Sequence, residues 1–494
     1  MSELTSTVID SIALPSGALL IGDQRVTDAS GGNYEHVYPG TGRPNATIEL
    51  AGPAEMDRAV TVARDAQRQW VSYSVDRRRD LLMGLADLVA ERAAELTRIN
   101  ACDYGVPVTM AGNSALTERF LRYYAGYIDK AHGLSTPVSG SFDVNIVERE
   151  PYGVVAVITP WNGPLVVIGS AVAPALVAGN AVILKPSELA PLAPLRFGEL
   201  CLEAGLPPGL INVLPAKAEG GQALVAHPGI GKIHFTGGHD TARQVLRTAA
   251  DNLTPVIAEL GGKSANLVFA DADLDSAATL AAFQGPLVQS GQSCACASRI
   301  LVQDSVYDMF LQKFLAAVQS APVGDPLRCD VLFGPVINEI AAERILAVID
   351  DTITQKTGEL VLGGHRIGGE LANGFYIEPT VFAEVDNSTE LAQQETFGPV
   401  VSVMRFRDED HAIELANDTQ YGLNAFVQTT NLRLAHRVAR RLEAGSVWVN
   451  THSDIEPQGP YGGYKHSGFG RSGGPDGLYE FLQAKNIRIG MAAM

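Results

Sequence analysis

The sequence predicts an α/β protein whose parallel sheets are buried on both faces. Three strand-like runs, Val154–Ile158, Ala181–Leu184 and Lys232–Phe235, alternate with helical patterns and Pro/Gly turns. Continuous runs rich in β-branched residues that alternate with helices are typical of a buried parallel sheet. The chain has 494 residues. At roughly 100–200 residues per domain, two or three units are expected.

The elements follow in a clear order along the chain. Apolar residues at helical spacing predict helices over residues 54–71 and 75–103. A second cycle of strands and helices begins after Glu259, and the tail Ala484–Met491 alternates like an edge strand that a neighbouring subunit can cover. The remaining predicted strands are Ile211–Leu214, Ala265–Phe269 and Arg299–Val302, and the remaining helices are Leu165–Ala178, 274–290, 305–319 and 339–356.

Composition excludes some classes of function. The net charge is −18, and non-specific nucleic-acid binding requires a basic surface, so no nucleic-acid partner is expected. The five cysteines are few and odd in number, which indicates a reducing compartment rather than a disulfide scaffold. Met1–Leu4 lacks the basic and apolar segments of a signal peptide. We therefore expect a cytoplasmic protein.

One uncharged segment, from Pro151 to Leu184, is long enough to span a bilayer. Pro160, Pro164 and Pro174 interrupt it, and such breakers would leave backbone groups unpaired in lipid. We interpret the segment as a strand, a turn, a helix and a second strand, and we expect no membrane association.

Cys294 lies in the segment Gly291–Arg299, between a Gly-Gln pair and a strand-like run. A free Cys is usually a small buried hydrophobe, and we assign that role to Cys102, Cys201 and Cys329. The setting of Cys294 instead suggests a nucleophile. The Cys-x-Cys pair that it forms is an alternative metal site, but no second pair or His cluster has zinc spacing, so no metal is predicted.

Two further residues point to covalent catalysis. Glu259 ends an apolar run; such a carboxylate is often only a surface group, but burial can make it a general base. Asn162 lies in the strand-to-helix turn Thr159–Pro164. That motif is either a simple tight turn or the source of an amide that donates to an oxyanion beside the Cys294 backbone N–H. Thiol and carboxylate together predict an acyl-enzyme that water hydrolyses.

Two strand ends resemble parts of a nucleotide site. Lys185–Glu188 follows a strand, where open α/β sheets bind ligands, and its Lys and Glu are either ribose contacts or a solvated charge pair. Phe235–Gly238 ends a strand and opens a helix, which suits a pyrophosphate. The usual Gly-x-Gly-x-x-Gly fingerprint is absent there. Glu395–Pro399 and Pro460–Gly468 are, taken alone, ordinary turns.

Taken together, these segments resemble the aldehyde dehydrogenase superfamily from about residue 20 to about residue 490, with seven motifs in the family's order. The resemblance implies an aldehyde dehydrogenase-like α/β fold: a Rossmann-like cofactor domain, an α/β catalytic domain and a small β oligomerisation arm. It also implies a homodimer or homotetramer. The implied division is residues 1–130 and 151–259 for the NAD-binding domain, 260–470 for the catalytic domain, and 131–150 with 471–494 for the arm.

The resemblance also implies roles for individual residues. Cys294 matches the nucleophile, Glu259 the general base and Asn162 the oxyanion donor in the oxidation of a small-molecule aldehyde to its acid. A carboxylate at the adenosine ribose favours NAD over NADP as cofactor. The implied cofactor contacts are Ile158, Thr159, Trp161, Lys185, Ser187, Glu188, Phe235, Thr236, Gly237, Gly238, Leu260, Glu395 and Phe397.

Four positions depart from the family pattern. Gly238 replaces a usual Ser, and Ala242 replaces a common Gly; both changes affect the expected affinity for the cofactor. Ser472 replaces a frequent Glu. Cys296 replaces a usual Ala; it either packs or forms a reversible disulfide or sulfenamide on oxidation.

The substrate is less defined. Several positions along the family's aldehyde tunnel are small here, which suggests a medium or bulky aldehyde, aromatic or long-chain. Asp454 and Glu456 near the expected mouth are either solvated or suited to a cationic aminoaldehyde. The tunnel positions are Gly163, Val167, Ser170, Ser293, Ile455 and Tyr461.

Two other functions compete with this one. A relative that transfers the acyl group to CoA generally lacks the base Glu, so Glu259 argues against it. A structural relative without activity is disfavoured because Cys294, Glu259 and Asn162 are all present.

Overall fold

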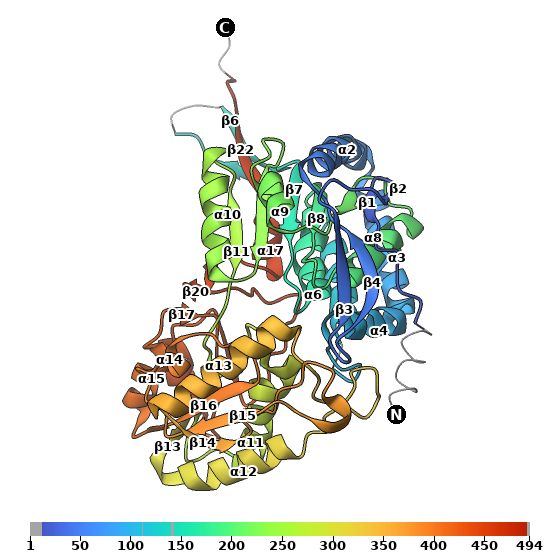
Figure 1. Ribbon diagram of the computed structural model, residues 1–494. Coiled ribbons are helices and arrows are strands. Elements are labelled where there is room, and N and C mark those ends of the chain that lie inside the picture. Colours follow the sequence, from blue (N-terminus) through green and yellow to red (C-terminus); the bar gives the residue numbers. More distant parts are fainter. Residues whose placement is uncertain (1–11, 111, 140–142, 492–494) are drawn as a thin grey trace.

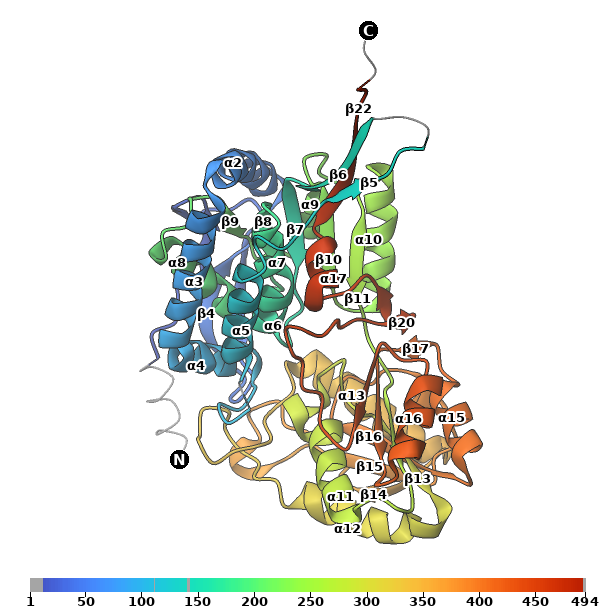
Figure 2. The ribbon, with the colours of Figure 1, turned by 180° about the vertical axis from the view of Figure 1, so that it is seen from behind.

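The computed structural model describes residues 12–110, 112–139 and 143–491. These residues form two α/β units and a small three-stranded sheet that projects from the first unit, on the side away from the second (Figures 1 and 2). Met1–Leu4, on which the expectation about a signal peptide rests, lies outside the described residues.

An eight-stranded sheet forms the centre of the first unit, in the order β2-β1-β9-β8-β7-β10-β11-β21. The five strands from β9 to β11 are parallel, as predicted, and almost all of their residues are buried. The strands are β1 (Leu19–Ile21), β2 (Gln24–Val26), β7 (Val154–Ile158), β8 (Ala181–Lys185), β9 (Ile211–Val213), β10 (Lys232–Thr236), β11 (Val256–Glu259) and β21 (Gly468–Phe469).

Helices cover both faces of this sheet (Figure 1). The prediction of one helix over 75–103 is wrong: α3 ends at Glu91 and α4 begins at Ala93, because the backbone of Arg92 (φ −95°, ψ 12°) leaves the helical range. The helices are α2 (Pro53–Ser72), α3 (Val75–Glu91), α4 (Ala93–Tyr104), α5 (Asn113–Ala125), α6 (Pro164–Val167), η1 (Ile168–Val172), α7 (Ala173–Val177), α8 (Leu192–Glu203), α9 (Ala218–Val225) and α10 (His239–Asp251). A hairpin of β3 (Asn33–Tyr38) and β4 (Arg43–Glu49) lies beside α4.

The uncharged segment 151–184 folds as predicted into strand β7, the helical stretch α6-η1-α7, and strand β8. The helical stretch is short and includes a π-helical turn, η1. No helix among the described residues combines the length and the apolar character that crossing a membrane requires.

The second unit is built on a seven-stranded sheet in the order β14-β15-β16-β13-β12-β18-β19. All of its pairings are parallel except β14 with β15. The strands are β12 (Ala265–Val268), β13 (Arg299–Gln303), β14 (Glu359–Leu362), β15 (Thr380–Ala383), β16 (Val400–Phe406), β18 (Asn424–Gln428) and β19 (Ser446–Val449). The α-helices are α11 (Leu274–Ala282), α12 (Tyr307–Gln319), α13 (Glu339–Gln355), α14 (Glu390–Gln393), α15 (Glu409–Asn417) and α16 (Leu432–Arg441).

The predicted helix over 274–290 is also wrong in its second half. After α11, the chain continues as a π-helical turn, η2 (Phe283–Leu287), and then as η3 (Val288–Gly291). Pro286 has no backbone N–H to donate, so a regular α-helix cannot continue through it. This irregular segment leads directly to the cysteine motif.

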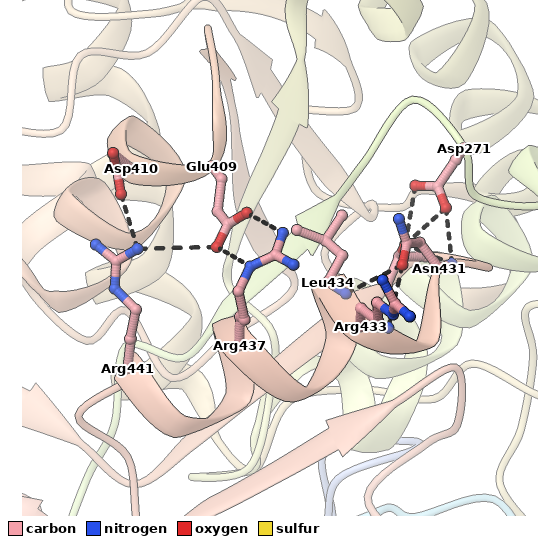
Figure 3. A network of polar contacts seen from close by, with 9 residues as sticks. Asp271, Glu409, Asp410, Asn431, Arg433, Leu434, Arg437 and Arg441 are labelled. Carbon is pink, nitrogen blue, oxygen red and sulfur yellow. Dashed lines mark hydrogen bonds and ion pairs between the residues drawn. The ribbon is translucent and has the colours of Figure 1, made fainter.

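Polar contacts at both ends attach α16 to its unit (Figure 3). Asn431 caps its N-terminus, and the Asp271 carboxylate accepts from the Asn431 N–H at 2.8 Å. Arg437 pairs with Glu409 of α15 at 2.6 Å. Arg437 and Arg441 of this amphipathic helix thus pair with acidic residues of α15.

The chain returns to the first unit near its end. Strand β21 pairs with β11, and Leu478 and Phe481 belong to the first unit's core, so residues 468–481 lie with that unit. The three-stranded sheet has the order β22-β6-β5, which confirms the tail as an edge strand. Its strands are β5 (Leu134–Thr136), β6 (Val144–Pro151) and β22 (Leu482–Ile489), and α17 (Gly474–Tyr479) precedes the last of them.

Candidate active site

The carboxyl ends of the parallel strands in the first unit bring the predicted residues to one edge. Ile158 pairs with Lys185 and Thr236 pairs with Glu259 in the register of the sheet. The turn that carries Asn162 follows β7 directly. Residues far apart in the sequence therefore meet at one edge, which faces the second unit.

A left-handed stretch of backbone brings the second unit's cysteine motif to this edge. Gln289, Ser290 and Gly291 have φ values of 50°, 54° and 71°. Non-glycine residues rarely adopt such values without strain. At Gly291 an added Cβ would lie 2.0 Å from the Gly398 carbonyl oxygen. Glycine is therefore required there by both the backbone and the close approach of Gly398.

Gln292 fixes this stretch and links it to Asn162. Its Nε2 donates to the carbonyl oxygens of Gln289 (3.1 Å) and Pro335 (3.3 Å), and its Oε1 accepts from the Ile337 N–H at 2.8 Å. Its own carbonyl oxygen accepts from Asn162 Nδ2 at 2.9 Å. The sequence analysis gave Gln292 no role, although its place in the Gly-Gln-x-Cys motif was the available signal.

Cys294 is half-buried among groups that control its ionisation. Burial and the negative charges of Glu395 and Glu259 raise the pKa of its thiol to about 12, against a hydrogen bond with Tyr461 that lowers it. The Tyr461 hydroxyl also accepts from Asn424 Nδ2 at 3.3 Å. The thiol is therefore protonated at neutral pH in this structure.

The Glu259 carboxyl group is buried without a hydrogen bond. The residue is 7% exposed, and neither carboxylate oxygen has a partner among the described residues. Burial raises its pKa well above the ordinary value, with Arg471 opposing the shift and Glu480 adding to it. An added Cβ at Gly462 would lie 2.9 Å from Glu259 Oε1, so that glycine leaves room for the carboxylate. A raised pKa suits a general base.

Lys185 ends β8, and Ser187 and Glu188 follow it. Ser187 Oγ is 3.5 Å from Glu188 Oε2, and burial lowers the pKa of Lys185 while Glu188 raises it. Tyr34 of β3 also lies near Glu188. Burial raises the pKa of the Tyr34 hydroxyl, and the negative charge of Glu188 raises it further. Lys217 Nζ lies 5.7 Å from the centre of the Tyr34 ring. Sequence reasoning missed Tyr34 and Lys217, which come from other parts of the chain.

The turn of Gly237 and Gly238 after β10 has free space beside Gly238. An added Cβ at Gly238 would have no atom within 4 Å, whereas one at Gly237 would lie 2.7 Å from the Phe235 ring. The Oγ1 atoms of Thr236 and Thr159 are buried without partners among the described residues. A cavity of about 360 Å³ adjoins the turn, lined by Gly238, His239, Asp240, Thr241, Arg243, Gln394, Glu395, Gln420 and Tyr421.

Glu395 and Phe397 reach this region from the second unit. Glu395 Oε1 accepts from the Gly262 N–H at 3.0 Å. The Phe397 ring meets the Trp161 ring edge to face, with centres 5.4 Å apart, and thus contacts the first unit. Lys263, which the sequence analysis did not assign, is buried near Glu395, and burial and the charge of Arg299 lower its pKa to about 7.

The predicted substrate positions fall into three groups. Val167 and Ser170 are buried on the helical stretch that Gly163 opens. Ser293 adjoins Cys294, and its Oγ accepts from the Ala295 N–H at 3.2 Å.

The third group of predicted substrate positions is Ile455 and Tyr461, and only one of these two contacts Cys294 directly. Tyr461 hydrogen-bonds to the thiol, whereas Ile455 packs against the core of the first unit. Glu456 forms an ion pair with Arg119 of α5, so its charge is already balanced.

The thiol of Cys296 is buried, and burial raises its pKa to about 12. Within residues 12–110, 112–139 and 143–491, no three His, Cys, Asp or Glu side chains are arranged to hold a metal ion.

Comparison with known proteins assigns the chain to a family. The profile of the Aldehyde dehydrogenase family matches residues 26–487. Aldehyde dehydrogenase family 2 member B4, mitochondrial, from Arabidopsis thaliana is 40% identical over 483 residues, covering 97% of this chain and 89% of that protein.

Solved structures agree with this assignment and with the predicted fold. PnpE from Pseudomonas sp. WBC-3, in complex with nicotinamide adenine dinucleotide, is 36% identical with a TM-score of 0.94, covering 97% of this chain and 98% of that one. A cysteine-to-alanine mutant of the indole-3-acetaldehyde dehydrogenase AldA from P. syringae, in complex with NAD+ and IAA, is 35% identical with a TM-score of 0.94, covering 98% of this chain and 99% of that one. The chain belongs to the aldehyde dehydrogenase family.

Proposed function

We propose that this enzyme oxidises an aldehyde to its carboxylic acid with NAD, through an acyl group on Cys294 that water hydrolyses. The observation that carries this proposal is the meeting of three groups where the two units join. Cys294 and Asn162 are connected through Gln292, and the unpaired Glu259 carboxyl group lies close enough to raise the pKa of the thiol.

The residues present fit a dinucleotide. We assign Lys185 and Glu188 to the adenosine ribose, the open turn at Gly238 to the pyrophosphate, and Glu395 to the nicotinamide ribose. The unpartnered Oγ1 atoms of Thr159 and Thr236 leave polar groups for a ligand. Two structural relatives are described in complex with NAD, which supports NAD as the cofactor here. When bound, NAD accepts a hydride from the substrate carbon.

The first chemical step requires the thiolate of Cys294, so the thiol first loses its proton, which is released to solvent. Its sulfur attacks the aldehyde carbon, and the carbonyl oxygen becomes an oxyanion in a thiohemiacetal. The free N–H of the Asn162 amide and the Cys294 backbone N–H are the donors assigned to that oxyanion. The Gln292 carbonyl engages the other Asn162 N–H and so fixes the amide. Loss of hydride from the carbon then leaves a thioester.

Glu259 acts in the second step. Its carboxylate removes a proton from water, and the resulting hydroxide attacks the thioester carbon. The carbon–sulfur bond breaks, the carboxylic acid leaves, and the departing Cys294 thiolate takes up the proton that Glu259 holds, which restores both residues. Burial supports this role because it raises the basicity of the carboxylate.

A spectrophotometric assay tests the function. NADH should form on mixing the enzyme with NAD+ and an aldehyde, and turnover should continue without CoA. A strict need for CoA would support the CoA-acylating alternative instead, and absence of NADH across a broad aldehyde panel would support the inactive relative.

For the substrate, we propose a medium or bulky aldehyde, aromatic or long-chain. The small residues Gly163, Ser170 and Ser293 support this proposal, and one relative is named for indole-3-acetaldehyde. The ion pair of Glu456 with Arg119 leaves less free negative charge for a cationic aminoaldehyde. In a substrate panel, kcat/KM should be higher for phenylacetaldehyde or octanal than for acetaldehyde. The reverse order would contradict the proposal.

We further propose a homodimer or homotetramer in which β22, an edge strand, is covered by a second subunit. Light scattering at several protein concentrations tests this assembly. Five free cysteines support a reducing compartment such as the cytoplasm.

A further inference from the structure

His36 lies in β3, away from Cys294, and is 1% exposed. Its Nδ1 is 2.6 Å from Asn45 Oδ1. Its Nε2 is 3.1 Å from both the Asp103 and the Leu189 carbonyl oxygens, and 3.4 Å from Asp103 Oδ1. Both ring nitrogens of this buried histidine therefore face oxygen atoms.

The hydrogen-bond partners of the two ring nitrogens define the protonation state of His36. Backbone carbonyl oxygens carry no proton, so Nε2 must donate. Asn45 Nδ2 donates to the Cys102 carbonyl oxygen at 3.4 Å, which directs Asn45 Oδ1 toward His36. Nδ1 must then donate as well. A ring that donates from both nitrogens is an imidazolium cation, and the Asp103 carboxylate lies beside it.

These contacts converge on the loop between β8 and α8, residues 186–191. His36 holds this loop at the Leu189 carbonyl, and the Leu189 N–H donates to Ser187 Oγ at 3.2 Å. Asp103 holds the start of α8, directly after the loop, because its carboxylate accepts from the N–H groups of Leu192 (3.1 Å) and Ala193 (2.9 Å). The loop carries Ser187 and Glu188 and depends on a pair of charged residues from β3 and α4.

We propose that the His36 imidazolium is a positioning residue for the cofactor: it fixes the 186–191 loop so that Glu188 meets the adenosine ribose, and its deprotonation weakens NAD binding. The inference rests on the proposed function for the role of Glu188. His36 itself touches neither the substrate nor the reacting atoms.

The electrostatic surroundings favour the cation. Burial lowers the pKa of His36, but Asp103, Asn45 and the Leu189 carbonyl raise it, and the net shift is upward. Other groups face the same region: Tyr34 on β3, whose ring centre is 6.5 Å away, Glu188 near Tyr34, and Lys217 over the Tyr34 ring.

The second unit also contributes a charge to this region. Glu339 of α13 lines a cavity of about 260 Å³ beside His36, and it is paired with Arg366.

The upward shift in the pKa of His36 sets the direction in which NAD binding depends on pH. A raised pKa means that the contribution of the imidazolium is fully present below about pH 6.5 and is lost as the pH rises through the pKa in the folded state. The dissociation constant for NAD+ should therefore rise on going from pH 6 to pH 9.5.

The test measures the Kd of NAD+ by calorimetry between pH 6 and 9.5, with kcat at saturating NAD+ alongside. In His36→Gln, a neutral side chain can still donate to Leu189, so folding is retained while the charge is lost. We expect Kd at pH 6.5 to rise about threefold to tenfold, close to the high-pH value of the wild type, with kcat unchanged. His411→Gln on α15 is the matched control and should behave as the wild type.

A second variant should keep His36 protonated to a higher pH. Asn45→Asp places a carboxylate beside Nδ1 and should move the rise in Kd upward by about one pH unit. An unchanged pH profile in both Asn45→Asp and His36→Gln would overturn the proposal, and so would a wild-type Kd that is constant over this pH range.

Glu188→Gln separates this proposal from the proposed function. It should weaken NAD+ binding at every pH. If it does not, the assignment of the ribose site fails. If Glu188→Gln weakens binding and His36→Gln does not, only the role of His36 is refuted.

Discussion

The side-chain amide of Asn162 donates a hydrogen bond to the backbone carbonyl oxygen of Gln292 at 2.9 Å. Asn162 follows a strand of the first unit, and Gln292 lies in the segment through which the second unit presents Cys294. This bond therefore connects the proposed oxyanion donor to the segment of the proposed nucleophile across the junction of two units. The geometry of the proposed catalysis depends on how both residues are held.

Gln292→Ala removes three side-chain hydrogen bonds, two of them buried, and loosens the cysteine segment. We expect the free energy of unfolding to fall by about 2–4 kcal/mol, and kcat to fall about tenfold or more, with little change in the Kd of NAD+. Denaturant unfolding and steady-state kinetics measure these changes. Gln312→Ala, at an exposed position of α12, serves as the control. A variant with wild-type kcat would show that Gln292 does not position the site.

Gly291→Ala tests the left-handed segment. The new methyl group would lie 2.0 Å from the Gly398 carbonyl oxygen at a residue with φ of 71°, so the segment must shift. We expect a lower Tm and a loss of activity of at least about tenfold. Gly84→Ala in α3 is the matched control, since its Cβ would meet no atom within 4 Å, and it should be neutral or stabilising. Equal behaviour of the two variants would contradict the strain argument.

The reactivity of Cys294 should depend steeply on pH. Because the pKa of its thiol is raised to about 12, the rate of alkylation by iodoacetamide without NAD+ should keep rising through about pH 10. The measurement uses a Cys329→Ala background, which removes the exposed thiol, and Cys294→Ala as the blank. A plateau below about pH 9 would mean that the thiol is ionised more easily than its surroundings imply.

His234 should make the protein sensitive to acid. Burial and the charge of Lys232 lower its pKa to about 3, so the unfolded chain takes up a proton at a higher pH than the folded protein does. Stability is then lost as the pH falls from about 6.5 toward 3, by about 2 kcal/mol at pH 5. Denaturant unfolding of His234→Gln should show a smaller loss between pH 7 and pH 5. An identical loss in both proteins would show that His234 does not contribute.

Much of the fold could be predicted from local patterns. Val154–Ile158 and Ala181–Leu184 are strands because continuous apolar runs need burial on both faces, and their order along the chain placed them in one sheet. The helix breaks near Arg92 and Pro286 were missed, because helical spacing of apolar residues continues across a break when both parts pack on the same core.

The site could be predicted only in part. Cys294, Glu259 and Asn162 stood out because their chemistry is distinctive in sequence. Gln292 and His36 did not, since their roles come from tertiary contacts with residues far along the chain. Such contacts leave no periodic pattern in the sequence.

The most direct test of the account is to trap the acyl group. Glu259→Gln enzyme, mixed with NAD+ and phenylacetaldehyde, should release about one equivalent of NADH per site and then stall, because deacylation lacks its base. Peptide mapping by mass spectrometry after an acid quench should then find the phenylacetyl group on Cys294. NADH formation with no acyl group on Cys294, or with the group on another residue, would contradict the central claim.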